Sequence, residues 1–213
     1  MTALGLAIEL ISVFLVLPAL YAAYGIGRIP LIPVLWVGAL ACISILRADE
    51  TFDRKSLWNG SAIRAQLKPI ALRFTICSVF VAFWVAWYAP EKLFDFPQRS
   101  PLLWGGVMVG YPIASVYAQE IIWRTFFFHR YRSLLPDRRA RIAASAIAFG
   151  YAHMIFHNWI AVLFTLIGGW FFAATFDKTR STAAACLDHA LLGCLMFTVG
   201  LGTYFYSGAV RVP

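Results

Sequence analysis

The chain has 213 residues, of which 61% are hydrophobic and 13% are charged. A soluble domain averages about 45–50% apolar and about 25% charged residues, so this composition excludes a soluble enzyme or a DNA-binding protein. The 18 Phe, 9 Tyr and 8 Trp residues suit lipid-facing and interfacial positions. We therefore expect an integral membrane protein in which residues 1–213 form a single domain.

Apolar segments follow one another along the chain and predict an all-α bundle of transmembrane helices. A span needs roughly 20 apolar residues, so the length allows about six to eight spans. The first segment carries Glu9 and lacks a basic start, which favours a retained span over a signal peptide. We expect about seven spans, at residues 3–24, 29–46, 69–89, 101–128, 142–157, 158–176 and 182–206.

Basic residues are concentrated on alternate connections between these segments. Twelve Lys and Arg residues lie in or beside the connections at 47–68, 129–141 and 178–180, against four in the others, Arg211 among them. Because cytoplasmic loops carry an excess of Lys and Arg, we expect the N-terminus and these three connections in the cytoplasm. The same bias explains the net charge of +8 without a nucleic-acid partner.

A few ionisable residues fall within the later spans, where each costs at least about 2.5–3.5 kcal/mol on insertion. They are Glu120, Arg124, His153, His157, Asp188 and His189, with Gln119 beside the first. Glu120 and Arg124 are four residues apart and share one helical face, so they could form a structural pair. Glu9 and Arg73 could also pair across helices.

Three of these residues lie at nearly the same predicted depth in the membrane. At about 1.5 Å per residue, Glu120, His153 and His189 each lie about 14–18 Å from the basic end of their helix. We therefore expect one polar chamber near the membrane midplane. A carboxylate with two imidazoles can hold a metal, relay protons or activate water.

No cofactor is firmly implied by these residues. A divalent metal is possible, but the H-E-x-x-H spacing typical of zinc sites is absent. His157 lies at the predicted membrane boundary, where a histidine needs no functional explanation. The oligomeric state cannot be read from the sequence.

Three short motifs within residues 115–195 point to a known family. They read Gln119-Glu120-Ile121-Ile122-Trp123-Arg124, Phe149-Gly150-Tyr151-Ala152-His153 and His189-Ala190-Leu191-Leu192-Gly193. In order and spacing they resemble the E-E-x-x-x-R, F-x-x-x-H and H-x-x-x-N/D motifs of the CAAX prenyl-protease and bacteriocin-processing (Abi) family. Since that family consists of intramembrane proteases, we expect residues 115–195 to form a protease-like core.

The resemblance implies that a glutamate and a histidine activate water against a peptide bond. It assigns His153 as the water-activating histidine, His189 as the oxyanion histidine and Arg124 as the motif arginine. It also implies a membrane-embedded or lipidated protein or peptide as substrate, and we expect the protein in the cytoplasmic membrane of a bacterium.

Two residues depart from the family pattern. Gln119 stands where the usual base is a glutamate, and an amide cannot accept the proton, so Glu120 would have to take over. Gly193 replaces the Asn or Asp of the third motif. We therefore expect a glutamate-type endopeptidase with Glu120, His153 and His189 as catalytic residues, supported by Arg124, Gln119 and Gly193. The alternatives are a catalytically weakened relative that binds a peptide or lipidated tail, and a small transporter.

Overall fold

The structure, a computed structural model, describes residues 2–25 and 28–205, and every regular element in this part of the chain is helical. The all-α fold expected from the sequence is confirmed. The elements of the first half of the chain are α1 (Ala3–Ile11), η1 (Ser12–Val16), α2 (Leu17–Leu20), η2 (Tyr21–Gly25), α3 (Leu31–Ala48), η3 (Arg54–Leu57), α4 (Gly60–Tyr88), η4 (Pro90–Lys92) and α5 (Asp95–Arg99).

The second half of the chain supplies the rest of the bundle. Its elements are α6 (Pro101–Tyr111), η5 (Pro112–Val116), α7 (Tyr117–Glu120), η6 (Ile121–Phe126), α8 (Phe127–Arg130), α9 (Arg138–Ala152), η7 (His153–Phe156), α10 (Trp159–Thr179), α11 (Thr182–Thr198) and η8 (Gly202–Phe205). The elements from α6 to α8 follow one another without a break, and η5 and η6 within them are π-helical. A π-helical turn accommodates an extra residue and changes the direction in which the following side chains point.

Within residues 2–25 and 28–205, four helical segments are long and apolar enough to cross a membrane: Ala3–Gly25, Leu31–Ala48, Gly60–Tyr88 and Trp159–Thr179. The helix Thr182–Thr198 is apolar but shorter. The structure thus agrees with a helical membrane bundle, and the number of seven spans stays a prediction.

Two helices differ in extent from the apolar segments predicted within them. Helix α4 begins nine residues before the third segment, because Asn59 caps it by accepting a hydrogen bond from the Ala62 amide. The last helix ends at Thr198 rather than at residue 206, and the chain turns at Gly200, whose φ of 92° favours glycine. Residue 206 and Arg211 lie outside the described residues.

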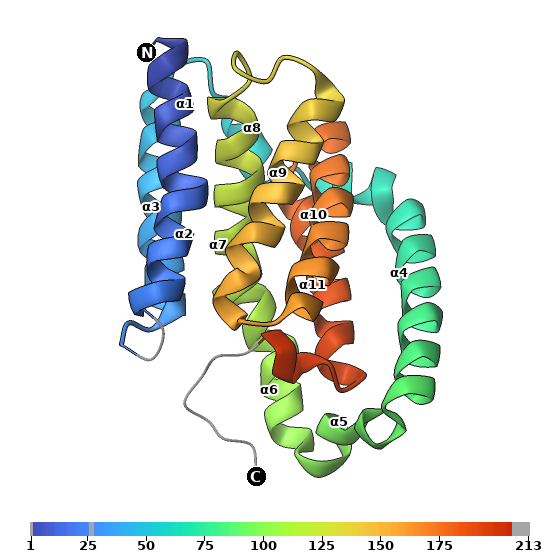
Figure 1. The fold of residues 1–213 in the computed structure, drawn as a ribbon. Helices are drawn as coiled ribbons and strands as arrows, with labels where there is room; N and C mark the ends of the chain where they lie inside the picture. The colour runs from blue at the N-terminus through green and yellow to red at the C-terminus, as the bar shows by residue number, and fades with distance from the viewer. Residues whose placement is uncertain (1, 26–27, 206–213) are drawn as a thin grey trace.

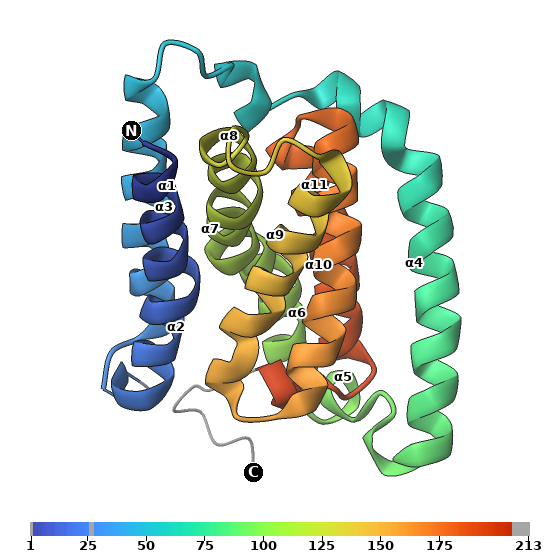
Figure 2. The ribbon, with the colours of Figure 1, turned by 45° about the horizontal axis from the view of Figure 1, so that its top comes forward.

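The helices alternate in direction, which gathers the basic connections at one end of the bundle (Figures 1 and 2). The connections from α3 to α4, from α8 to α9 and from α10 to α11 all lie near the start of α1 (Figure 1). Contacts tie this end together: Arg130 pairs with Glu9 at 2.7 Å, and the Ser181 hydroxyl donates to the Asn59 carbonyl at 3.3 Å.

Helices α9 and α10 pack closely against each other as an antiparallel pair. Small residues allow their close approach, since a Cβ at Gly169 would lie 3.3 Å from the backbone of Ala146 and 3.1 Å from the Phe149 ring. The predicted boundary between the segments 142–157 and 158–176 falls at a tight turn. His157 adopts the left-handed conformation, and Asn158 caps α10 by accepting from the Ala161 amide at 2.7 Å.

Helix α4 lies at the edge of the bundle, beside α11 and away from α1 and α3 (Figures 1 and 2). Its Arg73 forms an ion pair with the buried Asp188 of α11. The Thr175 hydroxyl of α10 donates to the same carboxylate at 2.7 Å. The expected pair of Arg73 with Glu9 is therefore wrong, because Glu9 pairs with Arg130 on α8.

Candidate functional site

The two motif histidines come from different helices and meet at one phenylalanine. His153 is the first residue of η7, directly after α9, and His189 lies in the first half of α11. The ring centroids of His153 and His189 lie 4.6 Å and 5.4 Å from the centroid of the Phe149 ring. Tertiary packing thus brings together two of the side chains expected at one depth.

Both histidines line a cavity of about 1440 Å³. Its walls are mostly aliphatic and aromatic, with the side chains of Gln119 and Tyr111 among the polar lining. A cavity of this kind, apolar with few convergent polar groups, is the usual form of a ligand site.

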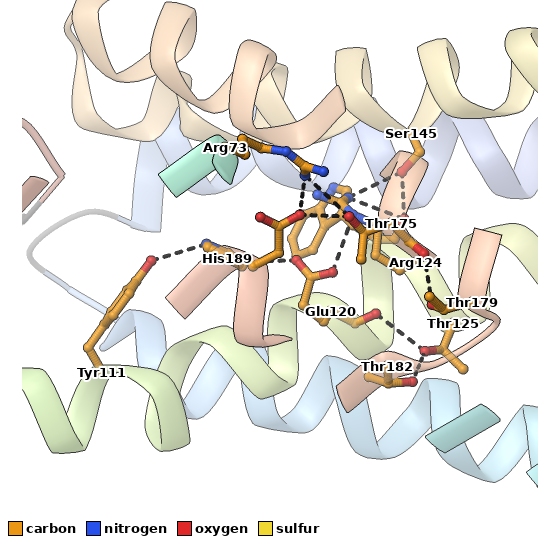
Figure 3. Close-up of polar contacts among 12 residues, drawn as sticks. Arg73, Tyr111, Glu120, Arg124, Thr125, Ser145, Thr175, Thr179, Thr182 and His189 are labelled. Carbon is orange, nitrogen blue, oxygen red and sulfur yellow. Dashed lines mark hydrogen bonds and ion pairs between the residues drawn. The ribbon is translucent and has the colours of Figure 1, made fainter. Parts of the chain in front are cut away.

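Glu120 lies behind His189 and does not line the cavity. Its side chain has no exposed surface, and its Oε1 lies 2.8 Å from Nδ1 of His189. Its other oxygen, Oε2, lies 3.3 Å from Nε of Arg124, so both oxygens face charged or polar partners (Figure 3). The expected Glu120–Arg124 pair is present.

Arg124 is also fully buried and holds the Glu120 carboxylate through this ion pair. It lies on the π-helical stretch η6, where one Nη1 hydrogen bond reaches the Ser145 hydroxyl at 3.2 Å. Its guanidinium carbon lies 4.6 Å from the centroid of Phe149, within range of a cation–π interaction. Stacking and pairing together fix the arginine, which in turn fixes Glu120.

A backbone contact fixes the tautomer of His153. Its Nδ1 lies 2.8 Å from the Phe149 carbonyl oxygen, which can only accept, so Nδ1 carries the hydrogen and donates it. In the neutral ring Nε2 then holds a lone pair, and this is the nitrogen that can take a proton from water.

Gln119 lines the cavity one residue before Glu120. Its side-chain nitrogen donates to the Ser115 hydroxyl at 2.7 Å, which leaves its carbonyl oxygen as a further acceptor. The amide can orient a water molecule but cannot remove its proton.

Tyr111 was not foreseen from the sequence and belongs to the site. Its hydroxyl lies 3.1 Å from Nε2 of His189, completing a chain from Glu120 through His189 to Tyr111 (Figure 3). The ring occupies the space next to Gly193, where a Cβ would lie 2.5 Å from the hydroxyl. No motif signals Tyr111, since its role depends on how α6 packs against α11.

His157 and Asp188 stand apart from this arrangement. His157 is exposed at the turn between η7 and α10 and does not line the cavity. Asp188 forms an ion pair with Arg73 and accepts a hydrogen bond from Thr175. Among the residues that the structure describes, no three His, Cys, Asp or Glu side chains gather closely enough to hold a metal ion.

The fold is that of a helical membrane bundle, and two histidines from different helices line one apolar cavity in it. Residues 97–195 match the family model of type II CAAX prenyl endopeptidases, described as Rce1-like, and this confirms the family resemblance. The matched segment contains all three motifs and spans slightly under half of the chain. Comparison with curated proteins gave no match, and comparison with solved structures gave none either.

Proposed function

We propose that the protein is an intramembrane endopeptidase that hydrolyses a peptide bond of a membrane-associated or lipidated protein or peptide precursor. The observation that carries this proposal is the pair of histidines on one cavity, each fixed at Nδ1 by a different partner. Nδ1 of His153 is held by a neutral carbonyl, whereas Nδ1 of His189 is held by a carboxylate. The two rings are thereby suited to different tasks.

His153 would activate the hydrolytic water. Its Nε2 takes a proton as the water oxygen attacks the peptide carbonyl, and returns it to the leaving amine when the C–N bond breaks. The Gln119 carbonyl oxygen would accept a hydrogen bond from the same water and orient it. Proton transfer by a positioned side chain contributes about 10²–10⁴-fold.

His189 would stabilise, through the positive charge of its ring, the negative charge that develops on the carbonyl oxygen. The Glu120 carboxylate lies against the imidazole that carries this charge, and Arg124 pairs with the carboxylate and holds it in place. Donors fixed before the reaction act strongly in a cavity with little water. Glu120 is then a positioning residue. This differs from the expectation that it contacts the water, because it is fully buried behind His189.

The apolar walls of the cavity suit the hydrocarbon part of such a substrate, whether a transmembrane peptide or a lipid tail. We also propose that the end of the bundle with the basic connections faces the cytoplasm. Clusters of Lys and Arg near a membrane surface favour the cytoplasmic leaflet.

One observation favours a second function, a binding protein without catalysis. Residue 119, which lines the cavity together with both histidines, is an amide rather than a carboxylate. Such a protein would hold a lipidated or membrane-embedded tail in the same apolar cavity and release it intact.

The test is cleavage of a library of internally quenched peptides, anchored by a farnesyl group or a transmembrane segment, by the protein reconstituted in liposomes. We expect the wild type to cleave some members, with and without a chelator, and His153→Ala to lose at least about 100-fold in rate. The matched control is His157→Asn, four residues away and exposed, which tolerates the left-handed backbone and should cleave like the wild type.

Gln119→Glu separates the two functions. It should raise the rate of a working protease, because the new carboxylate can share the proton with His153. If the wild type is inactive and only the Gln119→Glu variant cleaves, the second function, binding without catalysis, is established. Equal cleavage by the wild type and His153→Ala would overturn the proposed mechanism.

A further inference from the structure

We propose that Tyr111 is a further catalytic residue of this site, whose hydroxyl donates a hydrogen bond to the oxyanion from the position that Gly193 leaves open. The inference rests on the proposed function and names a group that no sequence motif includes. It follows from three features of the structure: the contact of Tyr111 with His189, the absence of a side chain at residue 193, and the attachment of α6 to α11.

The first feature is the chain of hydrogen bonds. Glu120 Oε1 lies 2.8 Å from Nδ1 of His189, and Nε2 of the same ring lies 3.1 Å from the Tyr111 hydroxyl. When both ring nitrogens carry a proton, Nδ1–H donates to the carboxylate and Nε2–H donates to the phenolic oxygen. The phenolic O–H is then free to donate into the cavity, which Tyr111 also lines.

The second feature is the space at Gly193. This glycine lies one helical turn after His189, so any side chain there would project toward the same part of the cavity. A Cβ at this position would lie 2.5 Å from both the hydroxyl oxygen and Cε1 of Tyr111. Real Cβ atoms do not approach this closely, so the position of the Tyr111 ring depends on glycine at residue 193.

The third feature is the way α6 is held. The indole nitrogen of Trp104 donates to the Thr198 hydroxyl at 3.1 Å, two helical turns before Tyr111. The Tyr111 ring packs edge to face against Phe197, with ring centroids 5.3 Å apart. Helix α6 is thus fixed to α11 at two levels, which holds Tyr111 beside His189 and packs its ring against α11.

The polar group near His189 therefore comes from α6 rather than from α11 itself. Through His189 the hydroxyl would be coupled to the buried carboxylate of Glu120, and it would transmit the positive charge of the imidazole to the carbonyl oxygen of the substrate. No bond is formed or broken by Tyr111, which contributes one hydrogen bond that strengthens as the oxyanion develops.

The experiment compares Tyr111→Phe with Tyr117→Phe in the liposome cleavage assay. Tyr117 is the matched control, because it lies on the same continuous helix but outside the cavity, against Trp36. We expect Tyr111→Phe to lower kcat about 10²–10³-fold, the range for removal of one oxyanion donor, with KM nearly unchanged. Tyr117→Phe should keep both parameters.

A swap tests the position as well as the residue. Gly193→Asn alone should lose activity because its Cβ collides with the Tyr111 ring, and Tyr111→Ala alone should lose it for want of the hydroxyl. The double variant Tyr111→Ala with Gly193→Asn should be more active than either, since the amide fills the vacated space. Thermal unfolding of each variant separates loss of function from loss of the fold.

A third readout is the binding of a peptidyl phosphinate that carries the side chains of the best substrate and is a stable mimic of the tetrahedral intermediate. Tyr111→Phe should weaken its binding about 100-fold while leaving the affinity for the cleaved product peptide unchanged. If the wild type cleaves, but Tyr111→Phe cleaves and binds equally well, this inference fails and the proposed function stands. If the wild type cleaves no peptide, the proposed function fails and the inference fails with it.

Discussion

The Glu120 carboxylate and the His189 imidazole, 69 residues apart in sequence, meet at 2.8 Å inside the bundle. Neither the carboxylate nor its arginine partner is exposed, so the interaction takes place where the effective dielectric is low. The buried charges of Glu120 and Arg124 are therefore tolerated only because each has its partner. This dependence makes the contact testable by stability as well as by activity.

Glu120→Gln should lower both stability and activity. It leaves Arg124 buried without its counter-charge, and breaking a buried pair in this way costs about 3–5 kcal/mol. The double variant Glu120→Gln with Arg124→Met removes both charges, so it should regain most of the free energy of unfolding without regaining cleavage. Thermal unfolding in lipid nanodiscs and the cleavage assay measure the two effects. Full cleavage by the double variant would contradict the positioning role.

Gly169→Ala should loosen the pair of α9 and α10. The added Cβ would lie 3.1 Å from Phe149, whose ring supports both histidines, and 3.3 Å from the backbone of Ala146. Overpacking of this kind costs about 1–3 kcal/mol. The matched control is Gly106→Ala in α6, where nothing lies within 4 Å of the new Cβ. Thermal unfolding should show a loss for the first variant and no loss for the second.

Arg73→Met should destabilise the attachment of α4 to the bundle. Asp188 would keep its hydrogen bond from Thr175 but lose its cation while buried, at a cost of about 3–5 kcal/mol. Adding Asp188→Asn removes the unpaired charge, and this double variant should unfold closer to the wild type. An unchanged unfolding temperature for Arg73→Met alone would show that the ion pair contributes nothing to stability.

Asp49, at the end of α3, should give a pH-dependent contribution to stability. Hydrogen bonds from Thr51 and from His129 lower the pKa of this carboxyl below its ordinary value. A lowered folded-state pKa stabilises the fold above the unfolded-state pKa of about 3.9, and the contribution is lost as pH falls toward the folded-state value. The wild type should therefore unfold at a higher temperature than Asp49→Asn at pH 7. The difference should shrink at pH 3, and a difference that grows on acidification would contradict the sign.

The sequence by itself determined the class of protein and the approximate positions of its helices. Hydropathy is a local property of a segment, and the rise per residue places Glu120, His153 and His189 at similar depths without any knowledge of packing. The pairing of Glu120 with Arg124 also follows from local geometry, because residues four apart share a helical face.

The tertiary structure alone decided what each of these residues faces. The rotation of a helix about its axis depends on its neighbours, and the π-helical turn η5 also changes the direction of the side chains after it, Glu120 among them. Glu120 points toward His189 rather than into the cavity, and the packing of α6 against α11 places Tyr111 in the space beside Gly193. For the same reason Arg73 meets Asp188 instead of Glu9, since a charge in an apolar bundle pairs with the partner that packing brings within reach.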